Sequence, residues 1–334
     1  MPTRPIRKVS FIGTGIMGAP IAGHLMDAGY ELTVYNRTKD KAQALLDRGA
    51  KWAPDVQSAA LGADVVFTMV GYPQDVEEVY LERDGLIRST AKGAWMVDLT
   101  TSSPQLARDI HDAAEVEDKH AFDCPVTGGQ QGAVDGTLTL MVGADEKDVE
   151  PLKPLLESFS SKVYYLGGPG RGQTVKLCNQ VSLALAMVGY AEALALAERS
   201  GVDQETMLDV VSHGMGGTTA MSRLAPRSLA GDFKPGFMAE HLRKDLGLAL
   251  QEAEDLGFAL PATEAANSLY DILCTVGGSR MGTQAISLLY QDDETGAAAG
   301  LNWSKIDEHD HEHDHEHDHE HDHHDHGHHH AHEH

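Results

Sequence analysis

Short apolar runs alternate with amphipathic segments through the first half of the chain. Residues 65–70 are apolar throughout, as in a parallel strand that helices cover on both faces. Helices are expected at residues 19–27 and 104–114. Strands of one sheet are expected at residues 9–12, 31–35, 65–70, 95–99, 121–124, 137–142 and 163–166. This alternation of strands and helices predicts an α/β domain.

From Gly172 onward the strand signals almost disappear. Residues 172–197 stay apolar on every side, so a long helix that is buried all round is expected there. Further helices are expected at 204–212, 239–256 and 262–274, separated by Gly201, by the glycines at 214–217 and by Pro261. The second half is therefore predicted to be all-helical.

A glycine-rich turn follows the first strand and precedes the first helix. Its sequence is Gly13-Thr14-Gly15-Ile16-Met17-Gly18. In this context Gly13 allows the tight turn, Gly15 lets the backbone approach a pyrophosphate, and Gly18 lets the helix pack on the sheet. The helix N-terminus then offers N–H groups to the phosphates. An ordinary glycine-rich turn is the alternative, and the strand–turn–helix context favours the dinucleotide site.

The predicted domains follow from these features. Residues 1–168 are expected to form an N-terminal Rossmann domain, and residues 169–300 an all-α C-terminal domain. A long interdomain helix, about residues 172–198, joins the two.

The end of the second strand bears on the choice of cofactor. An NAD site places an acidic residue there to accept the ribose hydroxyls, whereas this chain has Asn36, Arg37 and Thr38. Arg37 can pair with a 2′-phosphate and cover the adenine, and Thr38 can donate a hydrogen bond. NADPH is therefore favoured over NADH; the alternative is that Arg37 is only a surface residue. Lys39 and Lys41 are nearby, but exposed lysines at the start of a helix rarely have a specific role.

Two polar residues stand at the start of the long apolar helix. Lys176 and Asn179 lie three residues apart and therefore share one face. Such residues are costly on a buried surface unless they have partners, so a site is indicated. The alternative is a lysine whose amine reaches solvent at the helix end. Lys244 is a second candidate to reach the cleft expected between the two domains. The alternative is that Lys244 is an ordinary surface charge.

Hydroxyl and glycine residues follow two of the later strands. Residues 100–103 carry four hydroxyls at the strand end where ligands bind in open α/β sheets; capping of the next helix is the alternative. The glycines at 128, 129 and 132 leave the backbone open to a small ligand.

Composition and charge narrow the class of protein. The 334 residues carry a net charge of −25, and 11 of the 51 acidic residues lie in residues 307–334, where there is no Lys or Arg. The rest is still acidic, which argues against nucleic-acid binding. Three widely spaced cysteines and the lack of a leader-like start favour a reduced, cytoplasmic protein. The long apolar run contains Glu192 and is short for a membrane span, so no membrane anchor is expected.

Residues 307–334 alternate histidine with aspartate and glutamate. Without apolar residues this tail cannot form a core and is expected to be disordered. Imidazoles and carboxylates bind divalent ions, so Ni²⁺ or Zn²⁺ is expected on the tail, with a solubilising role as the alternative. The candidate ligands are His309, His311, His313, His315, His317 and His319.

Four motifs in order resemble the β-hydroxyacid dehydrogenase family. They are residues 11–20, residues 123–129 continuing to 138, residues 170–180, and Lys244-Asp245-Leu246. The resemblance covers about residues 7–290 and includes 3-hydroxyisobutyrate dehydrogenases and tartronate semialdehyde reductases. It implies that the enzyme interconverts a short 3-hydroxy acid and its semialdehyde, and that it forms homodimers or homotetramers through the helical domain.

The resemblance also implies roles for individual residues. It makes Lys176 the general acid and base, with Asn179 supporting substrate and lysine. It assigns the substrate carboxylate to Thr127, Gly128 and Gly129, and places Thr101 by the nicotinamide. The chain departs from the family at Thr127, where Ser is usual, and at Gln180, where many members have Asn.

Other readings are less favoured. An imine reductase shares this architecture but typically lacks the lysine, and a sensor of NADPH without activity would not need Lys176 and Asn179. In a third reading the protein is a metal buffer: the tail binds the metal and the folded domains only carry the tail. Deleting residues 307–334 and assaying turnover would separate this reading from an enzyme. An enzyme of the 6-phosphogluconate dehydrogenase type would have a longer helical domain.

Overall fold

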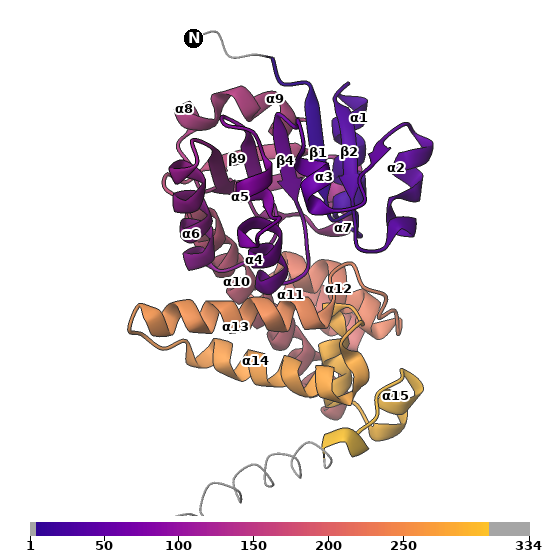
Figure 1. The fold of residues 1–334 in the computed structure, drawn as a ribbon. Coiled ribbons are helices and arrows are strands. Elements are labelled where there is room, and N and C mark those ends of the chain that lie inside the picture. The colour runs from indigo at the N-terminus through magenta and orange to yellow at the C-terminus, as the bar shows by residue number, and fades with distance from the viewer. Residues whose placement is uncertain (1–4, 307–334) are drawn as a thin grey trace, which may run out of the picture.

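The structure is a computed structural model that describes residues 5–306. A domain built on β-sheet lies above a helical domain in Figure 1, and helix α10 (Arg171–Arg199) passes from one to the other. The predicted metal ligands of the tail lie outside the described residues. The predicted fold class, a Rossmann domain followed by a helical domain, is confirmed by this architecture.

The first sheet has six parallel strands in the order β3-β2-β1-β4-β5-β6. Ile12 at the end of β1 is paired with Tyr35 of β2 on one side and with Thr68 of β4 on the other. The carboxyl ends of the central strands therefore meet at one edge, where ligands bind in such sheets. The strands are β1 (Lys8–Ile12), β2 (Glu31–Tyr35), β3 (Lys51–Trp52), β4 (Val65–Thr68), β5 (Trp95–Asp98) and β6 (His120–Asp123).

Helices cover both faces of this sheet, as its apolar strands require. Phe11 and Phe67 belong to a core on one face together with Ile21 and Leu25 of α1. Val66 and Met96 belong to a separate core on the other face. The helices are α1 (Gly18–Asp27), α2 (Gln43–Asp47), α3 (Val56–Ala60), α4 (Pro73–Leu81), α5 (Leu86–Ser89) and α6 (Pro104–Val116).

The expectation that later strands complete the same sheet is wrong. β7 (Val126–Thr127), β8 (Leu138–Val142) and β9 (Ser160–Tyr165) form a separate three-stranded sheet. β8 is antiparallel to β7 and parallel to β9. Pro125 lies between β6 and β7 and has no N–H to donate, so the strand is interrupted there. Helices α7 (Gly129–Asp135), α8 (Glu146–Val149) and α9 (Lys153–Glu157) connect these strands.

The second domain packs its helices around α10. Met187, Tyr190 and Leu194 of α10 are buried in a core with Leu242 and Tyr270. Pro226 lies inside α12, a helix that the sequence analysis did not anticipate. The elements are α11 (Gln204–Ser212), α12 (Thr219–Leu229), α13 (Ala239–Asp255), α14 (Pro261–Leu273), the 3₁₀ helix η4 (Thr283–Tyr290) and α15 (Asp293–Ala298).

Helix α10 is not buried all round, contrary to expectation. Val175 is 38% exposed, Leu185 36% and Leu196 70%, and these residues lie on one stripe of the helix. Length and composition alone would allow α10 to cross a membrane. Its opposite face, however, lies in the core of the helical domain, as in a soluble core helix. No other part of residues 5–306 covers this stripe. The helix is therefore exposed along one face although its sequence is apolar.

Candidate active site

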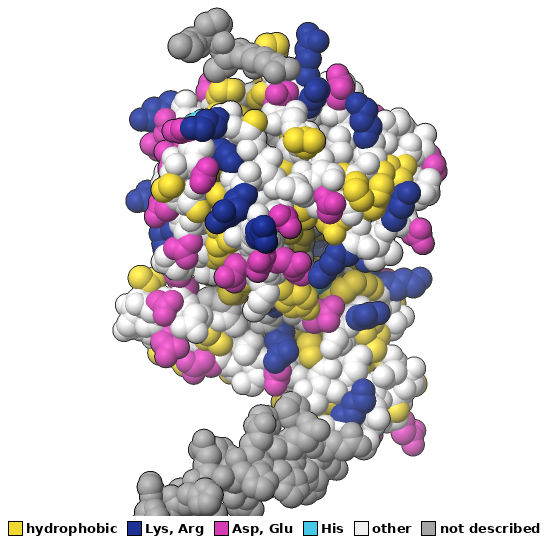
Figure 2. Space-filling view, in the orientation of Figure 1, with side chains coloured by type: hydrophobic (Ala, Val, Ile, Leu, Met, Phe, Trp, Pro, Cys, Tyr) yellow, Lys and Arg dark blue, Asp and Glu magenta, His cyan; other side chains and the backbone are white. Residues whose placement is uncertain are grey.

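A cleft of about 1050 Å³ opens between the two domains. Its walls come from the carboxyl ends of β1, β2, β4 and β5, from α4, and from the start of α13. Figure 2 shows a hollow between the two halves, rimmed by acidic and basic side chains. The cleft therefore lies at the sheet edge where the sequence places a dinucleotide.

The glycine-rich turn forms one end of the cleft. Gly13 has φ +95°, which side chains rarely adopt, and a Cβ there would overlap Met69 O. A Cβ at Gly18 would overlap Gly13 O, so this glycine allows the close approach of α1 to β1. A Cβ at Gly15, in contrast, would meet nothing within 4 Å. The turn thus leaves room beside Gly15 for the pyrophosphate of a dinucleotide. No side chain in residues 5–306 caps the N-terminus of α1, so its first N–H groups are left for a ligand.

Asn36 lines the cleft and also makes two hydrogen bonds to the backbone around it. Its Oδ1 accepts a hydrogen bond from Thr14 N at 3.0 Å, and its Nδ2 donates to Thr38 O at 2.8 Å. Asn36 therefore ties the glycine-rich turn to the end of β2. The Thr14 hydroxyl is buried and has no protein partner within residues 5–306.

The rim beside β2 carries the basic residues. Arg37, Thr38 and Lys41 are exposed and line the cleft. Lys41 lies close enough to contact a ligand in the cleft, but its side chain has no partner among the described residues, so a specific role for it stays untested. Lys39 lies over the Trp52 ring, 5.4 Å from its centroid, and is not among the lining residues of the cleft.

The loop after β5 is fixed by hydrogen bonds along its backbone. Thr100 N donates to Asp98 Oδ1 at 3.1 Å, and Thr100 Oγ1 accepts from Val70 N at 3.0 Å. Gln173 of α10 donates to Thr100 O at 2.7 Å and accepts from Ser102 N at 2.9 Å. Burial raises the pKa of Asp98 to about 6, because the charged carboxylate loses its hydration.

The hydroxyls at residues 100–103 have divided roles. Ser103 caps α6 by accepting from Gln105 N and Leu106 N. Thr100 anchors the loop, and Thr101 lines the cleft. Capping of the next helix is therefore confirmed for Ser103, whereas ligand binding by Thr101 stays a prediction.

Lys244 reaches the cleft from α13. Its amine donates to Thr101 O at 2.6 Å and lies 3.1 Å from Asp245 Oδ1. That contact is an ion pair only, because Asp245 Oδ1 accepts no hydrogen bond from the described residues. The interpretation of Lys244 as an ordinary surface charge is wrong, since its side chain is 12% exposed and joins the two domains.

A chain of hydrogen bonds leads from Asp245 to the face of α10 that carries Asn179. Asp245 Oδ2 accepts from Gln180 Nε2 at 2.6 Å, and Gln180 Oε1 accepts from Asn179 Nδ2 at 2.8 Å. Gln180, noted above only as a departure from the family, thus orients Asn179. Asp245 and Gln180 are both about 1% exposed, so their side chains have little freedom.

Lys176 is buried close to this chain. Among the described residues its amine has no hydrogen-bond partner, and Lys176 is not part of the cleft wall. Burial lowers the pKa of Lys176 to about 8; the charge of Asp245 opposes this shift, and that of Lys244 adds to it. An amine with this pKa can both give and take a proton near neutral pH.

Asp123, at the end of β6, fixes the start of α10. Its Oδ1 accepts from Gly170 N and its Oδ2 from Gln173 N, each at 2.8 Å. A Cβ at Gly172 would overlap Met141 O, so the helix start lies directly against β8. These contacts determine where Lys176 stands relative to the first domain.

The predicted substrate loop lies apart from the cleft wall. Thr127 is half-buried in β7, and Gly128 and Gly129 begin α7 with φ +132° and +66°. All three are described residues, and they neither line the cleft nor bond to Lys176 or Asn179. Their role in binding the substrate carboxylate stays a prediction.

Sequence reasoning missed residues whose partners are distant along the chain. Asp75 pairs with Arg37, Asp245 accepts from Gln180, and Asp123 accepts from the start of α10. A polar residue inside an apolar run, as at Gln173 and Gln180, was the available signal. No such signal marks Asp75, which lies in a polar helix.

Two family models together match most of the chain. Residues 8–167 match the NAD binding domain of 6-phosphogluconate dehydrogenase. Residues 170–290 match the model described as NAD-binding of NADP-dependent 3-hydroxyisobutyrate dehydrogenase.

Individual proteins agree with these models. A probable 3-hydroxyisobutyrate dehydrogenase-like protein (1, mitochondrial) of Arabidopsis thaliana is 43% identical over 84% of this chain and 84% of its own. An NAD-dependent L-serine dehydrogenase of Pseudomonas aeruginosa is 36% identical over 85% of this chain and 98% of its own. The solved structure of a Mycobacterium tuberculosis 3-hydroxyisobutyrate dehydrogenase with L-serine has a TM-score of 0.79 at 29% identity, and covers 86% of this chain and 100% of its own.

Proposed function

The chain belongs to the β-hydroxyacid dehydrogenase family, and from this premise we propose that it interconverts a short 3-hydroxy acid and its semialdehyde, with NADPH preferred over NADH. The observation that carries the proposal is the Lys176 amine, buried beside the Lys244–Asp245 pair with its pKa lowered to about 8. The residues around Gly15 fit a dinucleotide, because they leave open space in front of an uncapped helix.

The chemistry divides between cofactor and protein. When bound, the nicotinamide accepts or supplies the hydride at the alcohol carbon. In oxidation, neutral Lys176 takes the proton of the substrate hydroxyl; in reduction, charged Lys176 returns it to the carbonyl oxygen. Gln180 and Asp245 hold Asn179 by hydrogen bonds, and in this proposal Asn179 binds the same substrate oxygen. The backbone N–H groups of Gly128 and Gly129 are proposed to bind the carboxylate.

The substrate class rests on what two relatives share. The names of these relatives contain 3-hydroxyisobutyrate and L-serine, which both have a primary alcohol one carbon from the carbon that bears the carboxylate. We therefore place the substrate of this chain among such 3-hydroxy acids and their semialdehydes, with tartronate semialdehyde among the latter. Thr127 adds a methyl group where the family usually has serine, which favours a small substituent at the central carbon.

Turnover in both directions across pH tests this proposal. Oxidation of 3-hydroxyisobutyrate or L-serine requires neutral Lys176, so kcat/KM should rise as pH increases through about 8. Reduction of the matching semialdehyde requires the charged amine, so kcat/KM should fall through the same range. Steady-state rates with NADP⁺, NAD⁺ and the reduced cofactors provide the measurement. Profiles that move in the same direction, or no turnover of any such pair, would contradict the proposal.

The assembly is also a proposal. The exposed apolar stripe of α10 is suited to contact a second copy of the chain, since apolar patches of this kind mark protein interfaces. A homodimer or homotetramer formed through the helical domain follows, and a monomeric mass in light scattering would exclude it.

For the tail we propose binding of Ni²⁺ or Zn²⁺ to residues 307–334, on their sequence alone. Residues 5–306 contain no group of three or more potential metal ligands that could compete. Calorimetric titration should therefore give heat with the full chain and almost none after truncation at Ile306, and uptake should weaken as falling pH protonates the imidazoles. Equal heats from both proteins would rule the site out.

A further inference from the structure

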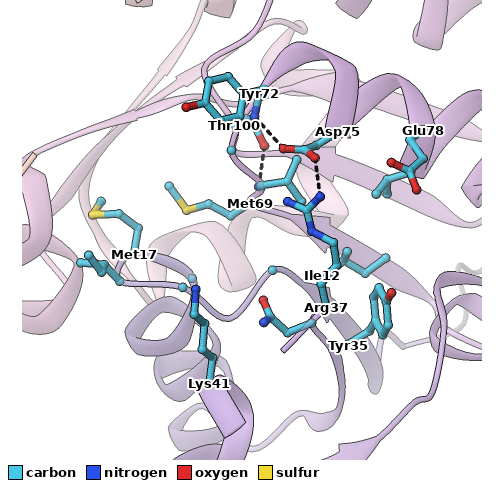
Figure 3. Close-up of a pocket in the computed structure, with 18 of the residues that line it drawn as sticks. Ile12, Met17, Tyr35, Arg37, Lys41, Met69, Tyr72, Asp75, Glu78 and Thr100 are labelled. Carbon is cyan, nitrogen blue, oxygen red and sulfur yellow. Dashed lines mark hydrogen bonds and ion pairs between the residues drawn. The ribbon is translucent and has the colours of Figure 1, made fainter. Parts of the chain in front are cut away.

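An ion pair connects the two sides of the cleft beside β2. Arg37 Nη1, at the end of β2, lies 2.9 Å from Asp75 Oδ1, in the first turn of α4 (Figure 3). Arg37 is also the residue that is expected to hold a 2′-phosphate. We propose that Asp75 determines cofactor specificity by competing with the 2′-phosphate for Arg37, which limits the preference for NADPH over NADH. The inference rests on the proposed use of Arg37.

The Asp75 carboxylate is the fixed member of this pair. Its second oxygen, Oδ2, accepts a hydrogen bond from Tyr72 N at 3.0 Å at the start of α4 (Figure 3). Its side chain is 14% exposed, whereas that of Arg37 is 74% exposed. The hydrogen bond from Tyr72 N and the low exposure of the side chain keep the carboxylate in place even when a ligand draws Arg37 away. Arg37 is the group that can move, so a phosphate must draw Arg37 away from an anion that remains nearby.

NADPH and NADH interact differently with the Asp75 carboxylate. A 2′-phosphate brings up to two further negative charges next to Asp75 and gains Arg37 only by breaking the existing pair. A ribose 2′-hydroxyl brings no charge, leaves the pair intact, and can donate to a carboxylate. Asp75 therefore disfavours NADPH relative to NADH. Glu78 also lines the cleft from α4, but it makes no ion pair with Arg37.

Asp75→Asn isolates this effect. The amide oxygen can still accept from Tyr72 N, so the start of α4 is kept while the charge is removed. The Kd of NADPH should fall about two- to fivefold, the range for an exposed ion pair, while the Kd of NADH changes less. The difference should shrink at high salt, because screening weakens the pair that competes. Fluorescence titration of both reduced cofactors at low and high ionic strength is the measurement.

Two matched variants show whether the effect passes through Arg37. Glu78→Gln removes a charge from the same wall without touching the pair, and should change the NADPH-to-NADH ratio less than Asp75→Asn does. When Arg37 is first replaced by Gln, Asp75→Asn should shift the NADPH-to-NADH affinity ratio less than it does in the presence of Arg37. Asp75→Ser, whose hydroxyl can also accept from Tyr72 N, provides a second route if the asparagine variant is poorly folded.

The outcomes separate this inference from the proposed function. Weaker NADPH binding in a folded Asp75→Asn or Asp75→Ser protein would overturn the inference, because the carboxylate would then orient Arg37 for the phosphate. An unchanged ratio in both variants would overturn it as well. If the wild-type chain prefers NADH, the proposed preference fails, yet an Arg37-dependent shift towards NADPH in Asp75→Asn would still support competition.

Discussion

Replacing Lys176 with alanine is expected to lower kcat by about 10² to 10⁴, the usual contribution of a general acid or base. The buried amine is the group proposed to exchange a proton with the substrate oxygen, and Asn179 cannot take over because an amide has no suitable pKa. Cofactor affinity should remain, since the glycine-rich turn and Arg37 lie in the first domain. Near-normal kcat in the variant would refute the mechanism.

Lys119 offers a matched control. It is 4% exposed, lies in the first domain, and donates to Ile87 O. Lys119→Met removes a buried lysine that is unrelated to the site, so the folded variant should keep its kcat. A loss as large as that of Lys176→Ala would show that burial of any lysine, rather than proton transfer, explains the effect.

Lys176→Met should nearly keep the length of the side chain and lose activity as Lys176→Ala does, yet stabilise the fold at pH 7. The pKa of Lys176 falls from 10.5 to about 8 on folding, so between these values the unfolded chain binds more protons. The free energy of unfolding of the wild type therefore rises with pH across this window. Below it, the charged amine costs up to ~3 kcal/mol, which methionine removes. Urea unfolding of both proteins at pH 7 measures the difference.

Arg37→Asp is expected to shift the ratio of NADPH to NADH affinity towards NADH by about 10- to 100-fold, the range for losing a charged hydrogen bond. The variant removes the cation that would bind the 2′-phosphate and adds a second carboxylate opposite Asp75. The new carboxylate can also accept from the ribose hydroxyls of NADH. Titration of both cofactors gives the ratio.

A charge change at a neighbouring position controls for long-range electrostatics. Lys39 lies over Trp52 and outside the cleft lining, so Lys39→Asp makes the same change of charge without touching the cofactor rim. The ratio of NADPH to NADH affinity in Lys39→Asp should stay close to that of the wild type. An equal shift in both variants, or no wild-type preference for NADPH, would contradict the role given to Arg37.

Much of the fold could be predicted because its signals are local. The strand, glycine-rich turn and helix from Lys8 to Asp27 are adjacent in sequence, and the apolar run of α10 identifies the longest helix. The second sheet was missed because a single residue, Pro125, interrupts the strand between β6 and β7. The exposure of α10 was missed because an apolar helix has the same sequence whether its own chain or another copy covers it.

The site was predictable only where one residue carries the signal by itself. Lys176 stands out because a lysine is costly in an apolar helix. The other pairs of the candidate site join positions far apart in sequence: 38 residues separate Arg37 from Asp75, and 65 separate Gln180 from Asp245. A single sequence contains no information on such pairs beyond their residue types. Side-chain geometry was needed to show that Asn36 binds the backbone and Lys244 binds Thr101.

The anchored start of α10 has a mechanical consequence. With a rise of 1.5 Å per residue, Lys176 lies about 8 Å along the axis from Arg171, whereas Arg199 lies about 42 Å along it. Asp123 and Gln173 hold the near end against the first domain, so that end acts as the pivot of a lever. A swing of the helical domain by about 10° around this pivot displaces the far end by about 7 Å and the base of Lys176 by only about 1 Å. Such a rotation would break the Lys244–Thr101 hydrogen bond between the domains, yet it would hardly change the position of the Lys176 backbone relative to the sheet.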